Sequence, residues 1–79
     1  DMNISQRNVQ GVCVLDIDGP VTLGPEGSER LGEKVRSVLA AGERKVVLNL
    51  SAVAYIDSAG LGELVNAFTS VKKQGGSLK

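Results

Sequence analysis

Hydrophobic residues follow a helical spacing in two parts of the chain. The first part is residues 28–41, where apolar residues stand at i, i+4, i+7 and i+8, which predicts an amphipathic helix with one buried stripe. They are Leu31, Val35, Val38 and Leu39. Charged residues of both signs occupy the other face, as on a solvated helix surface, and Gly42 is expected to end the helix.

The second helical pattern covers residues 58–73. Its apolar residues are expected to share one side of the helix and to face the core. They are Leu61, Leu64, Val65, Phe68 and Val71. Lys72 and Lys73 fall in the predicted last turn, where positive charge is favourable to the helix dipole, and Gly75-Gly76 is expected to stop the helix.

Short apolar runs of the kind found in strands occupy three other places. Residues 12–17 read VCVLDI, and the weaker run at residues 4–9 is expected to pair with them as a hairpin through Gln10-Gly11. Residues 45–50 read KVVLNL and form the strongest strand pattern. Because this run is almost continuously apolar, we expect it to be the central strand and to be covered on both faces.

Residues 77–79 look like the beginning of a further strand, so the expected order is β-β-α-β-α-(β). This order predicts an α/β domain whose later strands pair through helical crossovers. A chain of 79 residues holds one domain at most, and two helices with three full strands make a thin core. We therefore expect a missing C-terminal portion, or a sheet that another chain completes.

Composition excludes several classes of function. A formal net charge of zero and only two aromatic residues argue against a nucleic-acid surface, and no apolar run approaches the ~18 residues of a membrane-spanning helix. The chain has no His, which excludes a Ser-His triad and disfavours zinc. The single cysteine, Cys13, is expected to be a small buried hydrophobe. We therefore expect no catalytic residue, no metal and no cofactor.

The segment YIDSAGLGEL, residues 55–64, places Ser58 at the predicted start of the second helix. A hydrolase nucleophile turn would need G-x-S-x-G and an imidazole base, and both are lacking here. The glycines also fit no phosphate-binding loop motif. Asp57 and Ser58 are both favoured helix caps, so a plain capping role is the simplest interpretation.

Two features of the same segment favour a functional surface instead. Gly60 and Gly62 lie in the first turns of the predicted helix, where each costs about 1 kcal/mol relative to Ala unless a bare surface or a close backbone approach is needed. The start of a helix also favours anions, so Ser58 could carry a phosphate there. Together these features indicate a docking face that a phosphoryl group can switch.

The segment VVLNLSAVAYIDSAGLGELV resembles the signature region of the STAS domain, specifically of anti-sigma factor antagonists, where a D-S-[SAT]-G-[LIV]-G turn leads into the second helix. VCVLDIDG and GERKVVLNL are similar to the family's second and third strands, and the resemblance extends from Val12 to Leu78. It implies a STAS-like mixed β-sheet with amphipathic helices, forming one domain over residues 1–79 that is truncated at its fourth strand. It also implies a cytoplasmic regulatory protein that is not an enzyme.

The resemblance implies a set of partners as well. In such antagonists the unphosphorylated form binds an anti-sigma factor, which is commonly also a serine kinase. Phosphorylation of the serine in the D-S turn ends the association, and a phosphatase resets the cycle. The serine in that position here is Ser58. Thr22 stands in a loop where the family usually has an acidic residue. The implied partner-binding residues are Thr22, Asp57, Ser58, Ala59, Gly60, Leu61 and Gly62.

Other functions remain open at this point. The domain could be a STAS docking or scaffold module, in a transporter tail, a lipid-transport complex or a stress-sensing assembly, with Ser58 serving only as a cap. A small nucleotide-binding or phosphoryl-transfer enzyme is a third class, although no motif indicates it. Neither nucleic acid nor a membrane is expected as a direct partner, and an open sheet edge leaves room for a homodimer or strand exchange.

Overall fold

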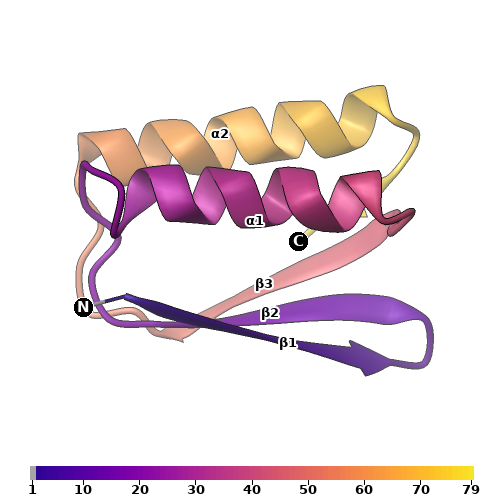
Figure 1. Ribbon diagram of the computed structural model, residues 1–79, viewed down its shortest axis with the longest axis horizontal. Helices are drawn as coiled ribbons and strands as arrows, with labels where there is room; N and C mark the ends of the chain where they lie inside the picture. Colours follow the sequence, from indigo (N-terminus) through magenta and orange to yellow (C-terminus); the bar gives the residue numbers. More distant parts are fainter. Residues whose placement is uncertain (1) are drawn as a thin grey trace.

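The computed structural model describes residues 2–79, which form a four-stranded sheet with two helices packed over one of its faces (Figure 1). The elements are β1 (Asn3–Val9), β2 (Val12–Asp18), α1 (Ser28–Ala40), β3 (Lys45–Ala52), α2 (Ser58–Lys73) and β4 (Ser77–Leu78). Strand order in the sheet is β1-β2-β3-β4; β1 is antiparallel to β2, and the other neighbours are parallel. The predicted α/β order is confirmed.

The hairpin between β1 and β2 has the two-residue turn expected from the sequence. Gln10 and Gly11 both have positive φ, 51° and 82°, and Val9 pairs with Val12 across the turn. Two successive positive φ angles give the type of tight turn whose twist matches that of antiparallel strands. The turn therefore fixes the register of the whole β1–β2 ribbon.

The core lies between the sheet and the helices. All four apolar residues of the α1 stripe are buried there, as predicted, against Leu15 and Ile17 of β2 and Val46 of β3. Cys13 is buried among them as a small hydrophobe, and burial raises the pKa of its thiol. The helix ends at Ala40, and the turn that follows passes through Gly42 at φ 101°.

The expectation that β3 is covered on both faces is wrong. Both helices lie on the same side of the sheet (Figure 1). The crossovers β2-α1-β3 and β3-α2-β4 step across the sheet in the same direction, and right-handed connections of that kind place their helices on one face. On the other face, Asp16 accepts hydrogen bonds from Arg7 Nε at 2.7 Å and Asn49 Nδ2 at 2.8 Å, and the Arg7 contact above all lowers the pKa of Asp16.

The apolar stripe of α2 also differs from the prediction. Val71 is fully buried, but Leu61 and Val65 are each 58% exposed and Phe68 is 50% exposed. The residues that α2 buries besides Val71 are the small Gly60 and Ala67. Small residues on the inner side let the helix approach its neighbours closely, and they leave the larger side chains turned partly outward. Neither α1 nor α2 is long and apolar enough to cross a membrane.

Candidate functional site

The candidate site is the start of α2, where Asp57 and not Ser58 is the helix cap. Asp57 has extended backbone angles, and its Oδ1 accepts a hydrogen bond from the Gly60 amide at 2.8 Å. This is the usual bond between a capping side chain and the third helical residue. Ser58 is the first residue of the helix and is exposed. The interpretation of Ser58 as the cap is therefore wrong, and its side chain is not needed for that purpose.

Asp57 also connects two segments that are distant in sequence. Its second oxygen, Oδ2, accepts a hydrogen bond from the Leu23 amide at 2.9 Å, in the loop that precedes α1. The Gly60 amide and then the Leu23 amide hold the pKa of the Asp57 carboxyl below its ordinary value, because both stabilise the charged form. Asp57 is thus a fixed anion with both oxygens engaged.

The loop before α1 is held against the loop before α2 by backbone contacts. Val21 forms an isolated parallel bridge with Ile56, its amide donates to the Tyr55 carbonyl at 2.9 Å, and its carbonyl accepts from the Asp57 amide at 3.3 Å. A Cβ on Gly60 would collide with the Val21 carbonyl oxygen. Gly60 is buried, and its lack of a side chain permits this close approach. It therefore packs beneath the site and is not part of the exposed face.

Gly62 has the opposite environment. Nothing lies within 4 Å of a Cβ placed on it, and the residue is exposed. The two glycines of the GLG sequence therefore have different reasons to be glycine. Gly60 is required by backbone packing, whereas Gly62 keeps a patch of helix surface bare beside the exposed Leu61. The structure gives Gly62 no packing role.

Thr22 takes part in the contacts around this site mainly through its backbone. Its carbonyl accepts a hydrogen bond from the Ser28 amide at 2.7 Å, which fixes the first residue of α1, and a Cβ on Gly27 would collide with that carbonyl. The Thr22 residue is half-buried. Its neighbour Leu23 is 77% exposed, although its amide is tied to Asp57.

Sequence reasoning missed Leu23. A leucine between a threonine and a glycine in a loop looks the same whether its side chain points inward or outward. The contact that matters, from the Leu23 amide to Asp57, joins residues 34 positions apart and leaves no local pattern. Only the three-dimensional approach of the two loops places an exposed leucine next to the start of α2.

The group at this site that is open to chemical modification is the Ser58 hydroxyl. Ser58 is exposed at the positive end of a helix, where the first amides point outward and favour an anion. No imidazole exists in the chain to act as its base, and both oxygens of the adjacent Asp57 already accept backbone hydrogen bonds. Among residues 2–79 no cluster of side chains suited to a metal ion is found.

Solved structures with the same fold include proteins described as anti-sigma factor antagonists. One from Thermotoga maritima superposes with a TM-score of 0.83 and 29% identity, covering 95% of this chain and 63% of that chain. The phosphorylated form of SpoIIAA, a Bacillus cell fate determinant, has a TM-score of 0.75 and 14% identity, covering 96% and 68%. At that identity, the second likeness shows the fold alone.

Sequence comparison gives a consistent result. A segment of 30 residues is 63% identical to the anti-sigma-B factor antagonist of Bacillus subtilis (strain 168), and it covers 38% of this chain and 28% of that protein. The chain thus matches less than a third of that relative's length. The match to the STAS domain extends over residues 3–79. Since this covers nearly every residue, the chain belongs to the STAS domain family.

Proposed function

We propose that this domain acts as an anti-sigma factor antagonist, which binds an anti-sigma factor until Ser58 is phosphorylated. The observation that carries the proposal is the exposure of Ser58 at the first position of α2, beside a cap that does not need its hydroxyl. The matches to proteins named as antagonists support the same role.

The docking face in this proposal has a rigid base and an exposed rim. Hydrogen bonds from Gly60 and Leu23 to Asp57 hold the base. The rim consists of Ser58, Leu61 and the bare Gly62, with Leu23 presented from the neighbouring loop. The Leu23 backbone is already held by its hydrogen bond to Asp57, so less backbone freedom is lost when its exposed side chain is bound, which favours affinity.

Phosphorylation would act on this face directly. A phosphate adds about −1.5 to −2 charges and three acceptor oxygens at pH 7, next to the Asp57 carboxylate. In a contact from which water is excluded, that charge and bulk would oppose docking. A loss of about 3 kcal/mol corresponds to a roughly hundredfold weaker complex. The release requires no change of fold, and a phosphatase would restore the binding form.

A kinase assay tests the site assignment. The full-length protein is incubated with ATP and the serine kinase of the same organism, and incorporation is located by mass spectrometry. We expect one phosphate on Ser58 and none in Ser58→Ala. Ser51→Ala is the matched control, because Ser51 is also exposed and lies just before the same loop.

Phosphorylation of Ser58→Ala at the parental rate would show that the site is elsewhere. A parent protein that is not modified at all, yet binds its partner, would favour a docking module without a phospho-switch.

A further inference from the structure

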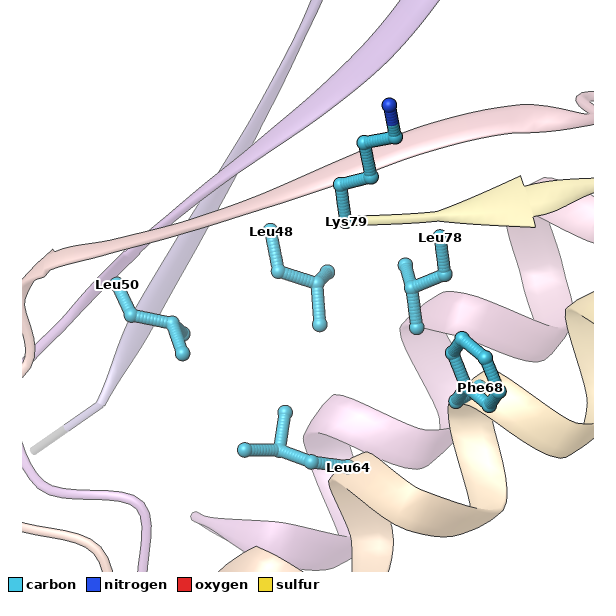
Figure 2. Close-up of a pocket in the computed structure, with 6 residues that line it drawn as sticks. All are labelled: Leu48, Leu50, Leu64, Phe68, Leu78 and Lys79. Atoms are coloured by element: carbon cyan, nitrogen blue, oxygen red, sulfur yellow. The ribbon is translucent and has the colours of Figure 1, made fainter.

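The face of the sheet away from the helices contains a hollow beside β4. In Figure 2, the Lys79 side chain points away from Leu64 and Phe68 of α2, toward this outer face. Because side chains alternate along a strand, Ser77 of β4 lies on the same face. The hollow is open and encloses about 390 Å³. It is lined by Val12 of β2, by Lys45, Val46 and Val47 of β3, and by Ser77 and Lys79.

The floor of the hollow is apolar and its rim is basic. Continuing the register of β2 with β3 by one residue places Val12 beside Lys45. Continuing the register of β3 with β4 in the same way places Val47 beside Lys79. The two valines are half-buried and the two lysines are exposed. Sites for small molecules commonly combine an apolar lining with a few polar groups in a volume of about 300–1,000 Å³, and the hollow has both properties.

The two lysines of the rim have no acidic partner in the part of the chain that the structure describes. Neither Lys45 nor Lys79 forms an ion pair within residues 2–79. Asp16 is the nearest acid among the outward positions of β2, and its carboxylate is already held by Arg7 and Asn49. Long side chains at diagonal positions of neighbouring strands reach one another, and like charges there repel. The rim of the hollow is therefore complementary to an anion.

A second copy of this chain fits the hollow poorly. The outward acids of β2 are Asp16 and Asp18, which lie toward the opposite end of the strand from the hollow. To bring Asp18 of another molecule to Lys45, the two sheets would stack with their β2 strands antiparallel. Val14 of each molecule would then lie against Asp16 of the other, which removes a charged group from water without a new partner. A small anion requires no such contact.

We propose that the hollow binds a small organic anion with an apolar body. The body of the ligand packs on Val12 and Val47. Its carboxylate or phosphate group lies between the ammonium groups of Lys45 and Lys79. β3 runs from the hollow to the loop that leads into α2, so this site and Ser58 are at opposite ends of β3. The inference is therefore independent of any phosphorylation at Ser58.

Titrations followed by the amide NMR signals of the protein test the proposal. The probes are octanoate and octyl phosphate, which carry the same chain with either anionic group, and the tighter of the two identifies the group. We expect saturable shifts of the Val12, Val47 and Ser77 amides with at least one probe, and none at Ser58. Octan-1-ol and inorganic phosphate are controls that each carry half of the ligand. Each should bind at least ~10-fold more weakly, because it lacks either the charge contacts or the apolar contact.

Charge-removing variants locate the anionic group. Lys45→Gln and Lys79→Gln each remove one ammonium group, and Lys73→Gln is the matched control, because Lys73 is exposed at the end of α2. We expect the dissociation constant of the tighter probe to rise about 3- to 5-fold in each of the first two variants, the effect of one exposed charge contact, and to stay unchanged in the control.

Three results would overturn the proposal: no saturable shift with either anion, equal binding of octan-1-ol, or an equal change in all three variants. Shifts at the hollow that depend on protein concentration without any probe would indicate a second copy on this face, and they would also contradict it.

Discussion

Helices α1 and α2 carry apolar residues at similar spacing, yet they use them differently. In α1 the whole stripe is buried between the helix and the sheet. In α2 only Val71 among the predicted stripe residues is fully buried, while Leu61, Val65 and Phe68 remain half exposed or more. The spacing therefore identifies residues that share a side of a helix, but the elements that pack against that side decide whether they are buried.

This difference has a consequence for function. The apolar side of α1 is buried in the core, whereas α2 has an exposed side that begins at Ser58. Ser58, Leu61 and Val65 stand at i, i+3 and i+7, so they lie on one side of the helix. In the proposed function, a phosphate at the first of these positions would lie at the end of an exposed apolar surface and would oppose docking there.

The largest expected effect is the difference in stability lost when an apolar stripe residue is truncated in α1 and when one is truncated in α2. Leu31→Ala in α1 removes a fully buried side chain and should lower the free energy of unfolding by about 2–5 kcal/mol. Val65→Ala in α2 should change it by less than ~0.5 kcal/mol, because that side chain is largely in water. Urea unfolding followed by circular dichroism measures both. Similar losses in the two variants would mean that the exposed side of α2 is covered in solution.

Gly60 and Gly62 allow the same comparison, between a buried and an exposed position, within one helix. Gly60→Ala brings a methyl group against the Val21 carbonyl and the Ile56 side chain and should destabilise the domain by about 1–3 kcal/mol. Gly62→Ala meets open space and should stabilise it by up to ~1 kcal/mol through helix propensity. Thermal unfolding gives both values. If Gly62→Ala also weakens partner binding, the bare surface is part of the docking face.

Asp57 and Ser58, at the start of α2, should also differ in how much they contribute to stability. Asp57→Ala removes the cap and the link to Leu23 and should cost about 0.5–2 kcal/mol. Ser58→Ala should leave stability within ~0.5 kcal/mol, since its hydroxyl is not the cap. Chemical unfolding of the two variants under identical conditions makes the test. A cost for Ser58→Ala equal to that for Asp57→Ala would restore a capping role for the serine.

The smallest effect concerns pH. The pKa of Asp57 is lower in the folded protein than its ordinary value of 3.8, so its contribution to stability is present above that pH. The contribution is lost as the pH falls through the lower, folded value. Asp57→Asn should therefore show a smaller loss of stability between pH 5 and pH 2 than the parent, measured by melting temperature. Asp16 shifts in the same direction but is present in both proteins, so the difference reports Asp57.

Local features of this fold were predictable from the sequence. The hairpin at Gln10-Gly11 and the start and end of α2 match because they depend on turn residues, a cap and helix-stopping glycines within a few positions. The segment around Ser58 was also identifiable from its DSAGLG sequence.

The remaining features depend on contacts between distant parts of the chain. The link from Leu23 to Asp57 and the burial of Gly60 under Val21 are set by how two loops meet. The placement of both helices on one face is set by the handedness of two crossovers. None of these features leaves a signature in a short window of sequence.

The most direct test of the proposed function is the affinity of the protein for the anti-sigma factor that the proposal assigns to it, before and after phosphorylation of Ser58. Isothermal titration calorimetry with the anti-sigma factor of the same organism, using protein phosphorylated only at Ser58, gives both dissociation constants. We predict that the phosphorylated form binds at least ~100-fold more weakly. Equal affinities of the two forms would contradict the proposal that Ser58 controls the docking face.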